Sequence, residues 1–314
     1  MLIVEKLHLK ESLSDTEECI VDFLLKQGRD IRKYSTRGLA EATYTSPSTI
    51  IRLCKKLGFK GYEEFKEQYL KEIQYLDQQA GQINVNFPFS KDDNMMKTAT
   101  KISLLYEETI QDTMSLLQYD SLKKAIALFK CNQNIYIFSA GTAINQAESF
   151  REKMLKIGKH VSISNNLNYQ LYEAGCLAKG DVAIIISYSG ETDKTVQVAR
   201  ECHKRSVPVI AITSFGDNTL SQYATCKLII STKENMFRNL GDFSTHVSIN
   251  LILDLLYSCW FLQDYDKNYQ RKLEKARTLE KLRKSNNSII MNSDEASEHE
   301  TFAMDFAENR NTVS

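Results

Sequence analysis

Five short apolar runs, separated by stretches of helical length, constrain the fold of this 314-residue chain more than any other feature. Such runs are typical of strands buried on both faces, and their alternation with helices indicates a parallel sheet. We therefore predict an α/β domain with five parallel strands, at residues 135–138, 161–163, 182–186, 209–212 and 228–230. Its helices are expected at about residues 96–129, 142–157, 168–178, 192–205, 217–224 and 244–263.

The N-terminal part of the chain shows helical periodicity throughout. A capping box begins at Ser14, and Gly28 ends the helix that follows it. A second, short helix starts after Ser35, and a third starts after Ser46 with a proline at its first position. A last amphipathic helix is expected at residues 62–76. These signals predict an all-α domain ahead of the α/β domain.

Loss of periodicity marks the boundary between the two domains, where Gly, Pro and several Asn residues indicate a linker. A basic final helix from residue 266 to 284 precedes an acidic, Ser- and Asn-rich tail that we expect to be disordered. The predicted divisions are 1–77 for the helical domain, 78–95 for the linker, 96–265 for the α/β domain and 266–314 for the C-terminal helix and tail.

Composition excludes several classes of protein. With 42% hydrophobic and 25% charged residues the chain matches an ordinary soluble globular protein. Its apolar runs are shorter than the ~20 residues that span a bilayer, and the N-terminus lacks the features of a secretory signal. Seven scattered Cys and five isolated His residues show no metal-ligand spacing. We expect a cytoplasmic protein with no membrane segment, no metal ion and no cofactor.

The third N-terminal helix has the character of a DNA-reading helix. The chain has 40 basic and 40 acidic residues, but residues 42–62 hold four basic residues and no acidic one. Two short helices joined by a tight turn fit a helix-turn-helix, in which the second helix enters the major groove. Hydroxyls and Arg suit base edges, whereas Lys suits phosphates. The predicted DNA-contacting residues are Ser46, Ser48, Thr49, Arg52, Lys55, Lys56 and Lys60. A helical bundle with a solvated basic face is the alternative.

A hydroxyl-rich loop follows the third predicted strand. Ser187, Ser189, Gly190 and Thr192 lie between that strand and the start of the next helix. Backbone N–H groups at a helix start favour an anion, and ligands of open parallel sheets bind at the carboxyl ends of strands. The loop therefore predicts an anion site, with an ordinary N-cap cluster as the alternative.

These motifs resemble a known family. The runs LSDTEECIVDFLL, LAEATYTSPSTIIRLCKKLGFKGYEEFK and SYSGET are similar to those of the bacterial RpiR-type transcriptional regulators over about residues 10–265. The resemblance implies a helix-turn-helix domain followed by a three-layer αβα sugar isomerase (SIS) domain that binds a phosphorylated sugar. It also implies a homodimer or homotetramer. The ligand-binding residues it implies are Ser139, Gly141, Thr142, Ser187, Ser189, Gly190 and Thr192.

Three positions depart from the family pattern. Tyr44 stands in the turn where many members have Gly, so strain or a reshaped turn is expected there. In the loop after the first strand, Ser139 replaces a Gly and Ala143 stands where a hydroxyl is common. The Ser139 or Thr142 hydroxyl is then the remaining donor.

The predicted function is that of a DNA-binding transcriptional regulator whose affinity for a double-stranded DNA operator is controlled by a sugar phosphate. An isomerase needs a positioned base. By residue type Glu173, Glu191, Glu234 and His246 are candidates, but no motif assigns any of them this role, so no catalytic residue is predicted. A sugar-phosphate isomerase with an accessory helical domain, and a sugar-phosphate-binding module that regulates another protein, remain as alternatives.

Overall fold

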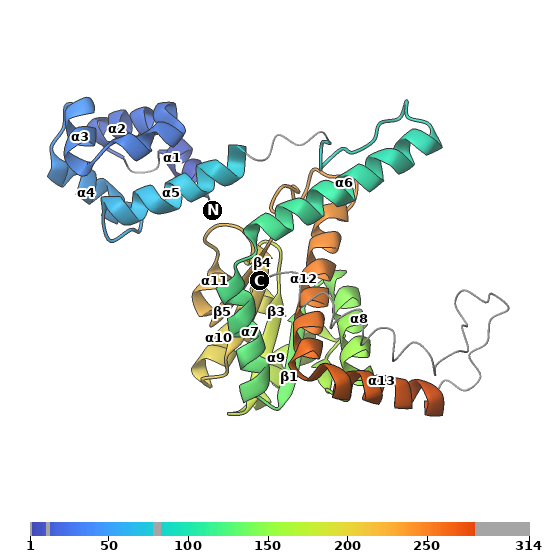
Figure 1. Cartoon of the computed structure of the whole chain (residues 1–314). Coiled ribbons are helices and arrows are strands. Elements are labelled where there is room, and N and C mark those ends of the chain that lie inside the picture. Colours follow the sequence, from blue (N-terminus) through green and yellow to red (C-terminus); the bar gives the residue numbers. More distant parts are fainter. Residues whose placement is uncertain (1, 11–12, 78–82, 280–314) are drawn as a thin grey trace, which may run out of the picture. The chain divides into compact units, whose positions relative to one another are not determined.

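The computed structural model of the chain describes residues 2–10, 13–77 and 83–279 (Figure 1). The chain divides into two units, Met1–Tyr265 and Asp266–Ser314, which are described separately. Within the first unit an N-terminal set of helices precedes an α/β domain.

The N-terminal helices are α1 (Ile3–Leu9), α2 (Asp15–Gln27), α3 (Thr36–Ala42), α4 (Pro47–Lys56) and α5 (Tyr62–Asp77), with a 3₁₀ turn η1 (Gly28–Lys33) after α2. The four predicted helices are confirmed. Their common core consists of Ile20, Leu24, Leu39, Ile50, Leu53, Phe65 and Tyr69, all buried.

Helix α1 is an addition that periodicity did not predict. It is only seven residues long and its first backbone N–H groups are satisfied by a distant side chain. The buried Glu72 on α5 accepts hydrogen bonds from Ile3 N and Val4 N, each at 2.7 Å. A carboxylate at a helix N-terminus is stabilising, so a contact across 69 residues of sequence holds α1 in place.

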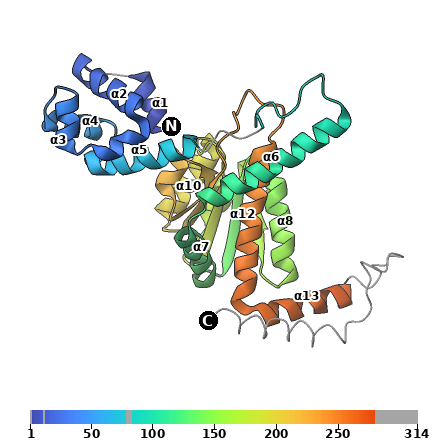
Figure 2. The same ribbon diagram turned by 45° about the horizontal axis from the view of Figure 1, so that its top comes forward.

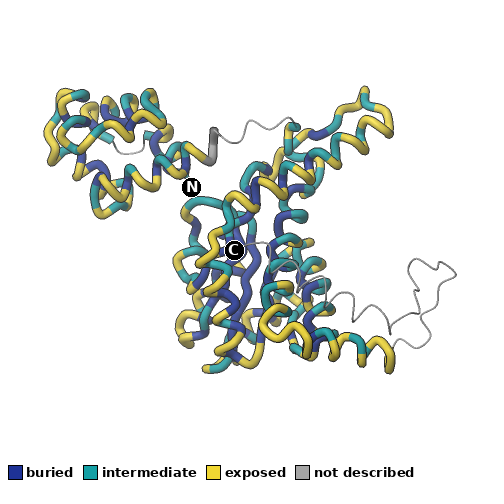
Figure 3. The backbone as a smooth tube through the Cα atoms, viewed as in Figure 1, coloured by how far each residue is buried: buried dark blue, intermediate teal, exposed yellow. Residues whose placement is uncertain are grey.

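The α/β domain contains one five-stranded parallel sheet in the order β2-β1-β3-β4-β5, as the apolar runs predicted. The strands are β1 (Asn134–Ser139), β2 (Val161–Ile163), β3 (Asp181–Ile186), β4 (Val209–Ser214) and β5 (Cys226–Ile230). Every residue of β3 is buried, which explains the uninterrupted apolar run at residues 182–186. Figure 3 shows the strands as the buried centre of this domain.

The helices of this domain are α6 (Met95–Leu116), α7 (Tyr119–Cys131), α8 (Ala143–Lys156), α9 (Leu167–Cys176), α10 (Asp193–Lys204), α11 (Thr219–Tyr223) and α12 (Phe243–Phe261), followed by the 3₁₀ turn η2 (Leu262–Asp264). The single helix predicted over 96–129 is wrong. Leu117 and Gln118 adopt extended backbone and separate α6 from α7. No Gly or Pro marks this break; it allows α7 to pack Ala125 and Phe129 into the sheet core while α6 packs on α12.

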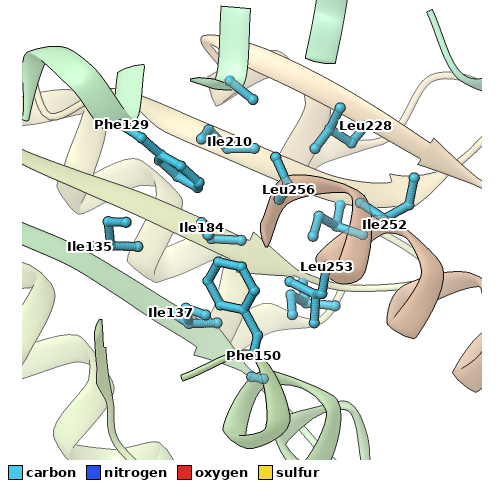
Figure 4. Close-up of a cluster of buried hydrophobic side chains, with 14 of the residues drawn as sticks. Phe129, Ile135, Ile137, Phe150, Ile184, Ile210, Leu228, Ile252, Leu253 and Leu256 are labelled. Carbon is cyan, nitrogen blue, oxygen red and sulfur yellow. The ribbon is translucent and has the colours of Figure 1, made fainter. Parts of the chain in front are cut away.

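Two hydrophobic clusters lie on opposite faces of the sheet. Helices α7, α8 and α12 cover one face, where alternate β3 residues such as Ile184 meet Phe129, Phe150 and Leu256 (Figure 4). Helices α9, α10 and α11 cover the other face, where Ile185 lies. Figures 1 and 2 show α12 running along the same face as α7 and α8. The domain is therefore a three-layer αβα arrangement.

Helix α12 packs on the sheet through its apolar residues. Ile249, Ile252, Leu253 and Leu256 are buried in the sheet core. Among the described residues, 243–279 is the one helical stretch long and apolar enough to cross a membrane by length and composition alone, a test that core helices also pass.

Helix α13 (Tyr265–Leu279) continues from the last residue of the first unit into the second, which confirms a helix at the start of the predicted 266–284 segment. The rest of that segment and the predicted acidic tail lie outside the described residues.

Candidate functional site

Two surfaces of the chain hold the predicted functional residues, and the first is the α3–α4 pair. Ser35 caps α3 by accepting from Gly38 N at 3.1 Å. Ser46 caps α4 by accepting from Thr49 N at 3.2 Å, with Pro47 at the first helical position. Buried Ile50, Leu53 and Cys54 fix α4 to the helical core. Two capped helices joined by a short turn form the predicted helix-turn-helix geometry.

Tyr44 lies in the turn with a φ of 53°, in the left-handed region. Its backbone N–H donates to Glu41 O at 3.2 Å, and its side chain is 99% exposed. The turn is therefore not reshaped: Tyr44 adopts the conformation that glycine adopts without cost. The predicted strain is present.

The predicted DNA-contacting side chains share the exposed surface of α4 and of the turn after it. Six are exposed and Thr49 is half-buried. The Ser46 hydroxyl lies 2.7 Å from that of Ser48 and 2.9 Å from that of Thr49. Lys55 and Lys60 make no side-chain ion pair with another described residue. The surface thus offers hydroxyls at the helix start and unpaired cations further along.

Ile51 lies on the exposed side of α4, although it directly follows the buried Ile50. It is 39% exposed. Its spacing from the buried Ile50, Leu53 and Cys54 places it on the outer face with Ser48 and Arg52. An apolar side chain on this face suits contact with a thymine methyl group.

Glu17 is a residue of this surface that sequence reasoning assigned only to a cap. Its Oε2 atom accepts from Lys56 Nζ at 2.8 Å, and its Oε1 atom lies 3.6 Å from Arg52 Nε. It also accepts from Ser14 N at 3.0 Å, as the capping box predicted. The Lys56 and Ser14 hydrogen bonds hold the pKa of this buried carboxyl below its usual value. Glu17 therefore joins α2 to two side chains of α4.

The second surface is a cavity of about 250 Å³ at the carboxyl ends of β1 and β3. From β1 the chain continues to β2 at one edge of the sheet, whereas from β3 it continues to β4, toward the other edge. Ligands of open α/β sheets bind at such a switch point. Its volume is just below the range of about 300–1,000 Å³ common for small-molecule sites.

Helix starts surround this cavity. Thr142 at the start of α8, Thr192 at the start of α10 and Asp242 at the start of α12 all line it. The positive ends of helix dipoles favour an anion. The described lining residues include no Lys or Arg, so an anion would be held by backbone N–H groups and neutral hydroxyls.

Five of the seven predicted ligand-binding residues lie on the cavity wall: Gly141, Thr142, Ser187, Ser189 and Thr192. The other two do not line it. Ser139 is buried at the end of β1, where its hydroxyl donates to Ala140 O at 3.4 Å. Gly190 has a φ of +67° and lies against Asn218, so closely that a Cβ would lie 2.2 Å from Asn218 Cγ. Gly190 thus shapes the loop that carries Ser187 and Ser189.

The opposite wall comes from α12 and the β5–α12 loop, residues 231–242. Glu234 is buried; its Oε2 atom accepts from Thr245 N at 2.8 Å and Thr245 Oγ1 at 2.7 Å. Its Oε1 atom is buried without a hydrogen-bond partner in the described structure. His246 Nε2 lies 2.7 Å from Thr142 Oγ1. The sequence identified these two residues only as candidate bases. Both line the cavity, to which they bring a carboxylate and an imidazole ring.

The other two candidate bases do not line the cavity. Glu191 accepts hydrogen bonds from Thr219 N at 2.8 Å and Thr219 Oγ1 at 2.6 Å. Glu173 lies on α9, where burial raises its pKa. Among the described residues, no group of three or more His, Cys, Asp and Glu side chains is placed to hold a metal ion.

Two family models match the chain, one on each of these surfaces. The model "Helix-turn-helix domain, rpiR family" matches residues 1–75, and the model "SIS domain" matches residues 127–258. The first match contains α3 and α4, and the second contains the whole sheet and most of the cavity wall.

Individual relatives share both regions. A protein of Haemophilus influenzae, described as an uncharacterized HTH-type transcriptional regulator, is 26% identical over 251 residues, which cover 80% of this chain and 86% of that protein. The structure of the Vibrio vulnificus NanR protein complexed with ManNAc-6P covers 90% of this chain and 99% of that chain, with 22% identity and a TM-score of 0.56. The sugar isomerase domain of an RpiR transcription factor from Sphaerobacter thermophilus covers 57% of this chain and 98% of that chain, with 16% identity and a TM-score of 0.50.

Proposed function

The chain belongs to the RpiR-type family of transcriptional regulators, in which a helix-turn-helix domain precedes a SIS domain, and we propose that a phosphorylated sugar bound in its SIS cavity controls its affinity for an operator. The observation that carries this proposal is the pairing of two separate surfaces in one chain. One surface has the charge and shape for DNA, and the other has the donors for a phosphate.

Recognition of DNA is assigned to α4 and the turn after it. Arg52 presents a guanidinium that can form two hydrogen bonds with one guanine, while Ser48, Thr49 and Ile51 lie near it for neighbouring base edges. Ser46, Lys55, Lys56 and Lys60 are assigned to phosphates, which position the helix without reading sequence.

Recognition of the effector is assigned to the cavity. The phosphate group would lie against the Gly141–Thr142 and Ser187–Thr192 loops, where the starts of α8 and α10 converge. The unpartnered Glu234 Oε1 would accept a hydrogen bond from a hydroxyl or amide N–H of the sugar, because a buried acceptor gains most from a donor. The Vibrio vulnificus protein of similar fold was solved with ManNAc-6P, a ligand of this chemical class.

The proposal also covers cell location and assembly. A regulator of this family acts on DNA in the cytoplasm, and we expect it to bind DNA as a homodimer or homotetramer, because helix-turn-helix pairs read two half-sites about one helical turn apart. Light scattering of the purified chain tests the oligomeric state.

The decisive experiment measures binding of the purified chain to DNA from its own promoter region over a salt series. It is repeated with a panel of hexose 6-phosphates and N-acetylhexosamine 6-phosphates that includes ManNAc-6P. We expect specific binding that weakens steeply with salt and that one panel compound shifts at least tenfold. Specific binding that no compound shifts would contradict the effector assignment, and absence of specific binding at low salt would contradict the regulator assignment.

Isomerisation of a sugar phosphate is a second candidate function, because Glu234 and His246 lie in the same cavity. An isomerase moves a proton between adjacent carbons and needs a base beside them. Turnover of an aldose phosphate by the pure protein, lost in Glu234→Gln, would favour this function. We expect no turnover with the panel, because the described lining residues include no Lys or Arg that could stabilise the negative charge of an enediolate.

A further inference from the structure

A short segment between the two domains contacts the α/β domain through Asn86, and through Phe89, whose ring centroid lies 6.4 Å from that of Phe243. Residues 83–94 follow residues 78–82, which lie outside the described structure, and precede α6. The Asn84 side chain accepts from Asn86 N at 3.0 Å and from Phe87 N at 3.1 Å, forming a tight turn. This turn presents the Asn86 side chain to the β5–α12 loop.

Both polar atoms of the Asn86 side-chain amide form hydrogen bonds with that loop. Its Oδ1 atom accepts from Asn235 N at 2.6 Å, and its Nδ2 group donates to Lys233 O at 3.4 Å. Its backbone carbonyl also accepts from Leu240 N at 3.0 Å. One residue of the segment therefore bonds to three positions of the loop.

The same loop forms one wall of the ligand cavity. Glu234, Asn235, Met236, Asn239 and Asp242 all line it. Asn235 takes part on both sides, because it borders the cavity while its backbone N–H donates to Asn86. A ligand that moves this wall must therefore move the partners of Asn86.

The opposite wall is tied to the loop as well. Tyr188 lies between the two serines of the predicted phosphate loop, and its hydroxyl donates to Glu234 O at 2.6 Å. Glu234 N in turn donates to the Tyr188 hydroxyl at 3.2 Å. Hydrogen bonds thus join Tyr188 of the phosphate loop to Glu234, and Asn86 to the residues on either side of Glu234, so the backbone of residues 233–235 connects the two sets.

We propose that Asn86 is the positioning residue that couples the cavity to the DNA-binding domain. Effector binding shifts the β5–α12 loop, the shift changes the hydrogen bonds of Asn86, and the contact of residues 83–94 with the α/β domain is kept or lost. This inference rests on the proposed function, since coupling requires that the effector and the operator favour different arrangements.

The test compares the full-length wild type with Asn86→Ala. Three quantities are measured: affinity for the panel compound that shifts the wild type, affinity for operator DNA, and the ratio of operator affinities without and with that compound. Asn86 touches neither ligand, so we expect both separate affinities to stay within threefold of wild type. The ratio is expected to fall from at least tenfold to less than threefold.

Two further variants make the result specific. Asn86→Asp keeps the acceptor for Asn235 N and loses the donor to Lys233 O, so an intermediate ratio is expected. Lys91→Ala changes an exposed position of the same segment. It is expected to keep the wild-type ratio, because loss of the Lys91 charge affects the operator affinities without and with the compound alike.

The outcomes separate this inference from the proposed function. A wild type that no panel compound shifts contradicts the proposed function itself. A wild type that responds while Asn86→Ala responds equally overturns the coupling role alone. Loss of effector binding or of the folded state in Asn86→Ala, judged by calorimetry and circular dichroism, also overturns it, because the residue would then support the cavity rather than transmit its state.

Discussion

The Lys56 Nζ atom of α4 lies 2.8 Å from the Oε2 atom of Glu17 on α2. Glu17 is buried, whereas the side chain of Lys56 is 37% exposed, so one end of the pair is fixed in the core and the other reaches the exposed surface of α4. The pair gives α2, outside the helix-turn-helix, a direct part in orienting the helix proposed to read DNA.

Glu17→Gln keeps the size of this side chain and removes its charge. We expect the free energy of unfolding at pH 7 to fall by about 1–3 kcal/mol, as for loss of a hydrogen bond to a charged group. The folded-state pKa of Glu17 is lowered, so its stabilisation is present above the unfolded-state pKa and is lost as pH falls through the folded-state pKa.

The difference between wild type and Glu17→Gln should therefore be constant from pH 7 down to about 5 and shrink below about 4.5. Urea denaturation at a series of pH values measures it. Glu41→Gln, at an exposed acid on α3, serves as the control and should change little. A difference that persists undiminished at pH 3 would show that charge is not its source.

Arg52→Ala and Lys55→Ala should weaken DNA binding in different ways. Arg52→Ala is expected to cost about 1–3 kcal/mol on the specific operator and to relax the base preference at one position. Lys55→Ala should weaken specific and random DNA alike and lower the slope of log affinity against log salt by about 1. Fluorescence anisotropy with operator and scrambled duplexes measures both. Equal behaviour of the two variants would refute the division between base and phosphate contacts.

Gly190→Ala should disrupt the loop that carries Ser187 and Ser189. Its new Cβ would lie 2.2 Å from Asn218 Cγ and Oδ1, and the φ of +67° adds strain of about 1–2 kcal/mol. Asn218 is not free to move, since it donates to Thr213 Oγ1 and accepts from Ser221 N. We expect a lower melting temperature and at least tenfold weaker binding of the effector by calorimetry.

Gly180→Ala separates the two causes. Gly180 also has a positive φ, of +102°, but a Cβ there would meet nothing within 4 Å. It should lower the melting temperature through strain and leave effector affinity near wild type. Equal loss of effector affinity in both variants would be evidence against a specific role of the Gly190–Asn218 contact.

Tyr44→Gly should stabilise the helical domain. Tyr44 has a φ of 53° and buries almost none of its side chain, so removing it relieves strain of about 1 kcal/mol without losing packing. Tyr44→Ala keeps a Cβ at the strained position and should give no such gain. Denaturant midpoints of the three proteins decide the matter, and a gain of equal size in the Ala variant would argue against backbone strain.

The layers of the fold could be predicted because local sequence determines them. All five strands overlap the predicted short apolar runs, of which residues 182–186 of β3 are the clearest, since parallel strands are buried on both faces. The N-terminal helices begin at Ser14, Ser35 and Ser46, whose hydroxyls accept the first backbone N–H groups. The break at Leu117 could not be predicted, because only packing of α7 on the sheet requires it.

The candidate site also has one part that could be predicted from the sequence and another that depends on the fold. The serines of the loop after β3 could be found, because they follow a strand and precede a helix start. The free oxygen of Glu234 and the contacts of Asn86 depend on residues far apart in sequence, such as Asn86 and Asn235, which are separated by 149 positions. Residue type identified Glu234 as a candidate base, but only the fold shows which of its two carboxylate oxygens lacks a hydrogen-bond partner.

The described residues of the cavity lining include no Lys or Arg. The two proposed sites should therefore respond differently to ionic strength. Mobile ions screen exposed cations strongly, and each phosphate contact proposed for α4 would release counterions on DNA binding. Fixed backbone dipoles in a recessed cavity are screened far less. On the proposed function, a change in ionic strength would therefore alter the affinity for operator DNA strongly while leaving the affinity for the effector nearly constant.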